Sequence, residues 1–93
     1  MYYILFYDLV EDYITKRAPL RPAHFDHVID SRSKGAFIMG GAFDDEKQAA
    51  LVFKTDQPES IEEFVKNDPY FTNGLVTNWE IRKWNVAITQ DHP

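Results

Sequence analysis

Six consecutive residues near the start of the chain, Tyr2–Tyr7, are all apolar or aromatic. A strand with one face in water alternates apolar and polar residues, so a run without a polar position predicts a strand that is covered on both faces. We therefore expect Tyr2–Tyr7 to be a central strand of a sheet, and an irregular polar segment to begin at Asp8.

Residues 22–34 have the spacing of an amphipathic helix. Pro22 suits the first helical turn, where a missing N–H costs nothing, and Gly35 suits the position just after the last turn. The residues at i, i+3, i+4 and i+7 define the face that we expect to meet the core. They are Phe25, Val28, Ile29 and Arg32.

The next segment has the pattern of a β-hairpin. Residues 36–43 and 48–55 are predicted strands, and the charged residues 44–47 form the turn between them. Gly40-Gly41 lies near the end of the first of these strands, which indicates a bulge or a close approach of two backbones.

A second helix and a last strand complete the pattern. Residues 59–67 are predicted to be helical, with acidic residues at the positive N-terminal end and a stop at Asp68-Pro69. Residues 75–88 are predicted to form a long strand. Leu75, Trp79 and Ile81 occupy odd positions. Trp84, Val86 and Ile88 occupy even ones, so we expect a bulge or bend near Arg82-Lys83.

The predicted order is β-α-β-β-α-β, which indicates a ferredoxin-like α+β fold with a four-stranded antiparallel sheet and two helices on one face. Two helices cover one face only, yet the first strand is apolar on both, and Trp79 and Trp84 have opposite phases. A second copy packed on the bare face would cover it, so we expect a homodimer, and the sequence leaves further assembly open. A monomer with scattered exposed aromatic residues is the alternative.

The length and charge of the chain narrow the classes of function. Its 93 residues suit a single domain, 1–93, in which we expect 88–93 to be a flexible tail. The net charge is −5, whereas nucleic acids and anionic membranes are bound by basic surfaces. We therefore expect neither a nucleic acid nor a membrane as a partner.

The absence of cysteine excludes a disulfide framework, a thiolate zinc site and a cysteine nucleophile. The first residues lack the basic leader and cleavage site of a signal peptide, and no apolar run approaches the roughly 18 residues of a membrane span. These features favour a cytoplasmic protein. Nucleotide-binding glycine motifs and the nucleophile elbow of hydrolases are also missing from the sequence.

Three histidines are candidates for chemistry. His92 belongs to the polar tail, and His27 is expected to face solvent beside Asp26 and Asp30. His24 lies at the margin of the predicted apolar face, where a side chain can reach a cleft, although a structural role is the more frequent one at such a position. His24 and His27 are three residues apart, but no third ligand is evident, so we expect no metal site.

Asp68 precedes a proline, which disfavours helical geometry and fixes the direction of its side chain. The alternative is an Asp-Pro turn in which the carboxylate only accepts hydrogen bonds from nearby backbone groups. Arg17 and Arg21 precede the helix that carries His24, where they are placed to bind a carboxylate or phenolate or to serve a structural role. The acidic turn 44–46 lacks the spaced oxygens of a calcium loop and is expected to be solvated.

The ordered set of these motifs resembles the YciI-like (YCII-related) family of the dimeric α+β barrel superfamily, over nearly the whole chain. The resemblance is carried by Met1-Tyr2-Tyr3, Lys16-Arg17, Arg21-x-x-His24, Met39-Gly40-Gly41, Asp68-Pro69-Tyr70 and a late tryptophan. One departure is Ala42, where many members have proline.

The resemblance implies a cleft in each subunit that contains a pair formed by His24 and Asp68. Some relatives dehalogenate chlorinated hydroxyquinones, and many have no assigned activity. A carboxylate beside an imidazole stabilises its protonated form and fixes its tautomer and orientation. Such a pair suits proton transfer to or from a small, activated substrate.

From this pattern we expect a cofactor-free acid–base enzyme, in which His24 is the general acid/base and Asp68 orients it. A lyase or dehydrohalogenase step on a phenolic, quinone-type or enol-type substrate is the most specific form of this hypothesis. The alternative is a non-catalytic small-molecule-binding or accessory module of the same fold. The residues expected to bind a small anionic or phenolic ligand are Arg17, Arg21, Gly41 and Tyr70.

Overall fold

The computed structural model describes residues 1–34 and 36–90, so the predicted helix terminator Gly35 and His92 lie outside the described residues. The elements are β1 (Tyr2–Leu9), α1 (Tyr13–Arg17), α2 (Arg21–Ser33), β2 (Phe37–Ala42), β3 (Gln48–Lys54), α3 (Glu59–Asn67), α4 (Pro69–Thr72) and β4 (Val76–Trp84). This order confirms the predicted α+β fold, to which α1 and α4 add two short helices that the sequence pattern did not indicate.

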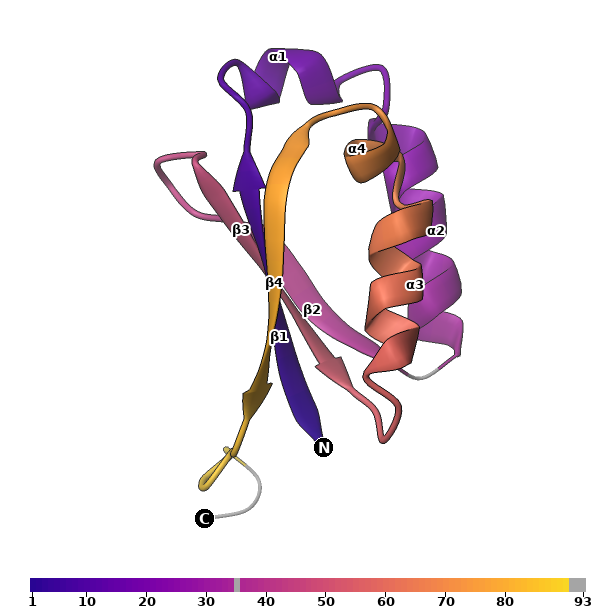
Figure 1. Cartoon of the computed structure of the whole chain (residues 1–93), viewed down its shortest axis with the longest axis vertical. Helices are drawn as coiled ribbons and strands as arrows, with labels where there is room; N and C mark the ends of the chain where they lie inside the picture. Colours follow the sequence, from indigo (N-terminus) through magenta and orange to yellow (C-terminus); the bar gives the residue numbers. More distant parts are fainter. Residues whose placement is uncertain (35, 91–93) are drawn as a thin grey trace.

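The four strands form one antiparallel sheet in the order β2-β3-β1-β4, so β1 is a central strand as predicted. Helices α2 and α3 lie on the same side of this sheet (Figure 1). On the other side, Figure 1 shows no helix of the described chain. The sheet therefore has one covered face and one open face.

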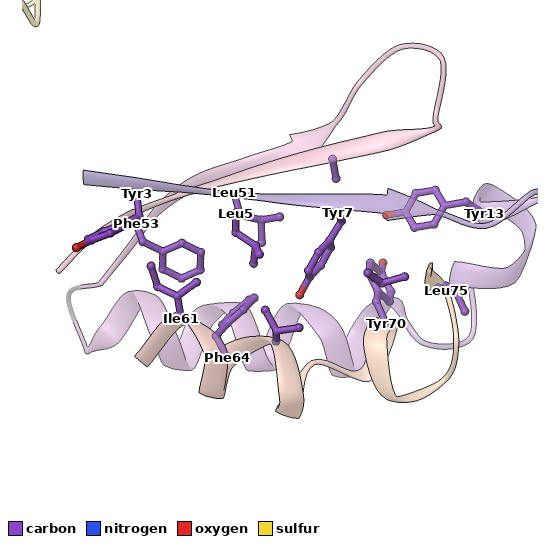
Figure 2. Packing of buried hydrophobic residues seen from close by; sticks show 13 residues of the cluster. Tyr3, Leu5, Tyr7, Tyr13, Leu51, Phe53, Ile61, Phe64, Tyr70 and Leu75 are labelled. Carbon is purple, nitrogen blue, oxygen red and sulfur yellow. The ribbon is translucent and has the colours of Figure 1, made fainter. Parts of the chain in front are cut away.

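The core fills the space between the sheet and the helices. Alternate residues of β1, Tyr3, Leu5 and Tyr7, point toward the helices and are buried (Figure 2). From the opposite side, α3 contributes the face that its i, i+3, i+4 spacing predicts, with Ile61 and Phe64 facing β1. Burial of such side chains is the main favourable term in folding, at about 25 cal/mol per Å² of apolar surface.

The face of α2 that meets the core differs from the predicted one. Phe25 and Ile29, expected to be inside, are 46% and 48% exposed, whereas His24 is buried. A second set with the same i, i+3, i+4 spacing begins at His24 and continues through His27 and Val28, and these are the residues that turn inward. Hydrophobicity alone did not find this face, because polar contacts rather than apolar burial hold its histidines in place.

The predicted bend near Arg82-Lys83 is wrong. The pairs from Asp8↔Asn78 to Tyr2↔Trp84 follow each other without interruption, and the only irregularity between β1 and β4 lies at Asp8/Leu9. The strand keeps one phase and ends at Trp84 rather than at residue 88. Its two apolar phases reflect two apolar faces of the sheet, so no bend is needed to explain them.

The open face carries a band of apolar side chains. Directly paired residues of antiparallel strands lie on the same face, so Tyr2 shares the open face with Trp84, and Val52 shares it with Met39 and Ile4. Met39 and Trp84 are 62% and 47% exposed.

The β2–β3 hairpin has a close approach at Gly40, whereas its irregularity lies at the start of β2 rather than at the two glycines. The register shifts between Phe37 and Met39, and a Cβ atom at Gly40 would lie 3.0 Å from Cγ of Leu51. A larger side chain at Gly40 would therefore press on Leu51, whereas Gly41 has open space beside it.

Candidate functional site

Asp68 is positioned by the proline that follows it. Helix α3 ends at Asn67, and Asp68 has extended geometry (φ −73°, ψ 121°), as the sequence predicts for a residue before proline. Helix α4 then begins at Pro69, and Oδ1 of Asp68 accepts a hydrogen bond from the backbone N–H of Tyr70 at 3.0 Å. The carboxylate thus caps α4 from a fully buried position, with an exposed fraction of 0%.

Two side chains from other elements meet the same carboxylate. Nδ1 of His24, on α2, lies 2.6 Å from Oδ1 of Asp68, and the hydroxyl of Tyr7, on β1, donates to Oδ2 at 2.8 Å. An ionised carboxylate accepts hydrogen bonds and has none to donate, so this arrangement places a proton on Nδ1 of His24. In the neutral ring, Nε2 then carries the free lone pair.

The His24 ring is held by a stacking contact on one face as well as by the hydrogen bond at Nδ1. Its plane stacks on the ring of Tyr70 with a centroid distance of 3.7 Å and an angle of 7°. Within residues 1–34 and 36–90, no protein group hydrogen bonds Nε2, and no buried side-chain nitrogen or oxygen lacks a partner. Nε2 is therefore accessible, while the rest of the ring is fixed.

His24 belongs to the wall of a cavity of about 210 Å³ between α1, α2, β2 and the end of β1, and Nε2 is the ring nitrogen that Asp68 leaves free. Five of the six residues that the sequence singled out line this cavity, and Asp68 lies behind His24 without lining it. The five are Arg17, Arg21, His24, Gly41 and Tyr70.

The two arginines bring positive charge to the cavity. The guanidinium of Arg17 lies 5.2 Å from the ring centroid of Tyr13, and that of Arg21 lies 4.9 Å from the ring centroid of Phe25. In the described part of the chain neither arginine forms an ion pair with a carboxylate. Their charges are therefore available to an anionic ligand.

Two tyrosines of the site are held in their protonated form. Burial, assisted by Tyr13 and opposed by Arg17 and Arg21, raises the pKa of Tyr70 to about 12. Burial, together with the charge of Asp68 and the hydrogen bond to it, raises the pKa of Tyr7 well above its usual range. Both hydroxyl groups remain donors throughout the neutral range.

Sequence reasoning missed Tyr7 and Tyr13, which also line the cavity. The inward alternation of β1 placed Tyr7 on one face of the sheet, but no local pattern links it to a residue 61 positions away. Tyr13 packs edge-on against Tyr70 at 5.8 Å, and it lies in a segment expected to be irregular.

The expectation that His27 faces solvent is wrong. Its ring is half-buried, stacks on Phe64 at 4.5 Å, and Nε2 lies 2.8 Å from the backbone oxygen of Phe64. His27 therefore links α2 to α3 outside the cavity.

Among the described residues, no group of three His, Asp or Glu side chains is arranged to hold a metal ion. No described helix is long and apolar enough to cross a membrane.

Comparison with known proteins agrees with this architecture. The YCII-related domain family matches residues 1–85, and the chain belongs to this family. A solved structure with the same fold is 5-chloro-2-hydroxyhydroquinone dehydrochlorinase (TftG) from Burkholderia phenoliruptrix AC1100, in complex with 2,5-dihydroxybenzoquinone. The match has a TM-score of 0.77 and 19% sequence identity, and it covers 94% of this chain and 96% of that chain. No curated protein matches the chain.

Proposed function

We propose that this protein is a small acid–base enzyme that acts, without a cofactor, on an activated phenolic, quinone-type or enol-type ring. The observation that carries the proposal is the placement of His24, which lines the cavity while its Nδ1 is bound to buried Asp68, so that Nε2 is left without a protein partner among the described residues. A base fixed in this way abstracts a proton without first reorganising its own hydrogen bonds.

The cavity suits a ligand with one substituted ring. An apolar cavity of about 150 Å³ holds a benzene molecule, so about 210 Å³ accommodates a six-membered ring with several oxygen substituents. Tyr13, Tyr70 and Phe25 supply flat apolar walls, and Arg17 and Arg21 supply positive charge. These features favour a hydroxylated ring that binds as a phenolate.

The magnitude of acid–base catalysis limits the substrate further. Assistance by one general acid/base contributes about 10²–10⁴-fold in rate, or roughly 3–5 kcal/mol of the barrier. That contribution is too small for unaided hydrolysis of an amide or a phosphate ester. It is sufficient for a ring whose hydroxyl protons are already acidic.

Loss of hydrogen chloride from a chlorinated hydroquinone fits these requirements. His24 would take the proton of one ring hydroxyl and return it to the ring carbon that carries chlorine. Loss of a second hydroxyl proton then drives the electron pair through the ring and expels chloride, which leaves a quinone. The net change is loss of one proton and one chloride ion, with no external oxidant. The similar fold of the dehydrochlorinase supports testing this chemistry first.

We also propose that the open face of the sheet is the interface of a homodimer. Met39 and Trp84 expose large apolar side chains beside Tyr2, Ile4 and Val52 on one continuous face. Burial of this band against a second copy removes it from water, and a two-fold axis lets the same residues serve both subunits.

The decisive experiment follows chloride release and the ultraviolet spectrum when the protein is mixed with 5-chloro-2-hydroxyhydroquinone. The proposal predicts stoichiometric chloride and quinone at a rate above the spontaneous reaction. The same ring without chlorine serves as control and should bind without releasing an ion. If 2,5-dihydroxybenzoquinone raises the melting temperature but no activated ring is turned over, the protein is a binding module and the catalytic proposal is wrong.

A further inference from the structure

The hydroxyl of Tyr7 holds the carboxylate oxygen that His24 does not use. It donates to Oδ2 of Asp68 at 2.8 Å, whereas Nδ1 of His24 and the backbone N–H of Tyr70 both meet Oδ1. Within the described residues, Tyr7 is the sole partner of Oδ2. Oδ1 thus binds His24 and the N-terminus of α4, whereas Oδ2 binds Tyr7.

Tyr7 is itself rigidly placed. It lies within β1, the central strand, where it pairs with Ala49 of β3 on one side and Trp79 of β4 on the other. Its side chain is 1% exposed and points toward the helices (Figure 2). This pairing fixes the backbone of Tyr7, so its hydroxyl adds a second constraint to a carboxylate that Pro69 already restricts.

We propose that Tyr7 is a positioning residue that acts through Asp68: its hydroxyl fixes the carboxylate and draws negative charge away from His24, so that the imidazolium releases its proton more readily. This inference rests on the proposed function and assigns Tyr7 a role in tuning the base. The physical reason is that a hydrogen bond to a carboxylate stabilises its charge, and a partly satisfied carboxylate attracts a proton on the imidazole less strongly.

Other titratable and charged groups lie around the imidazole of His24. Their electrostatic effect on the imidazole is unchanged when only the Tyr7 hydroxyl is removed. Those that share the cavity or touch the ring are Asp68 and Tyr70 at α4, Tyr13 and Arg17 on α1, and Arg21 on α2. Burial and the charge of Asp68 raise the pKa of Tyr7 well above its usual range, so its hydroxyl remains a donor in the neutral range.

The test follows the titration of His24 by NMR in the ligand-free protein, so it does not depend on turnover. In Tyr7→Phe the midpoint of the His24 titration should move to higher pH, by on the order of one pH unit. Tyr3→Phe is the matched control, because Tyr3 is buried on the same face of the same strand and its hydroxyl contacts Met1 instead. The midpoint should not move in this control.

A double-mutant cycle separates positioning from a general structural effect. If Tyr7 acts through Asp68, Tyr7→Phe should leave the midpoint unchanged in an Asp68→Asn background. An unchanged or lowered midpoint in Tyr7→Phe, or an equal increase in the control or in the Asp68→Asn background, would overturn the proposal.

A substitution that keeps the hydroxyl guards against loss of folding. Tyr7→3-fluorotyrosine makes the hydroxyl a stronger donor, so the midpoint should move to lower pH, and movement in the opposite direction would contradict the proposal.

If a turnover assay is established, the acid limb of the rate profile of Tyr7→Phe should move with the NMR midpoint. A change in KM alone would mean that Tyr7 contacts the ligand rather than tunes the base. Absence of turnover in the wild-type protein would remove the proposed function and leave the NMR result to decide the role of Tyr7.

Discussion

Nδ1 of His24 lies 2.6 Å from Oδ1 of Asp68, although the two residues are 44 positions apart in the chain. The contact joins α2 to the junction between α3 and α4, and both partners are buried. Its effect is to fix which nitrogen of the imidazole carries a proton. In the neutral ring, the remaining nitrogen then carries the free lone pair.

Replacement of Asp68 by asparagine tests this assignment of the proton. In Asp68→Asn the side-chain amide can donate to Nδ1, which reverses the tautomer and places the proton on Nε2. We expect turnover to fall by about 10²-fold or more, but by less than in His24→Ala. Stability should also fall by about 1–3 kcal/mol, because buried donors lose part of an acceptor. Steady-state rates and denaturant unfolding measure the two effects, and wild-type rates in Asp68→Asn would contradict the assignment.

Removal of the cavity arginines should weaken binding more than chemistry. In Arg17→Gln or Arg21→Gln the ligand loses one positive charge, and we expect KM to rise several-fold while kcat changes little. Lys34→Gln is the control, because this lysine pairs with Asp30 away from the cavity. Wild-type KM values in both arginine variants would show that the ligand does not bind as an anion beside α1 and α2.

A charge on the open face should separate the proposed dimer. Trp84→Asp places a carboxylate within the apolar band, and we expect sedimentation equilibrium to show a monomer. Ile29→Asp is a matched control, since Ile29 on α2 and Trp84 on β4 are 48% and 47% exposed, respectively. A wild-type monomer would contradict the proposed dimer, and loss of the dimer in the control alone would place the interface elsewhere.

The raised pKa of buried Tyr70 predicts a loss of stability at alkaline pH. The pKa of Tyr70 is about 12 in the fold, against an ordinary value of about 10, so the unfolded chain loses this proton first as the pH rises. The free energy of unfolding should therefore decrease between about pH 10 and 12 and be independent of this group below that window. Tyr70→Phe should flatten this decrease, which urea unfolding at several pH values can measure. An unchanged slope would show that Tyr70 is not responsible.

The sequence predicts the fold well because the patterns that define it are local. The apolar run of β1 and the i, i+3, i+4 spacing of α3 each report one element and its buried face. In α2 the same argument selects Phe25 and Ile29, because two overlapping faces have helical spacing and only one is apolar. In the structure the face that contains His24 turns inward instead, because His24 hydrogen bonds the buried carboxylate of Asp68 there.

The site is predictable only in part for the same reason. The proline after Asp68 restricts its backbone, and Arg17 and Arg21 precede the helix of His24, but only the resemblance to the YciI-like family implies that His24 and Asp68 form a pair. Tyr7 was not identified, because its role depends on a contact across 61 positions that leaves no trace in local spacing. Long-range hydrogen bonds of this kind become visible only when the strands and helices are in place.

Turnover by His24→Ala tests the central claim most directly. The variant removes the accessible base and leaves the cavity and its arginines in place, and His27→Ala, three residues along the same helix and outside the cavity, serves as control. With 5-chloro-2-hydroxyhydroquinone as substrate, we predict that chloride release by His24→Ala falls to the spontaneous rate, while His27→Ala, compared below its own melting temperature, retains most of the wild-type rate. Wild-type chloride release by folded His24→Ala would contradict the account.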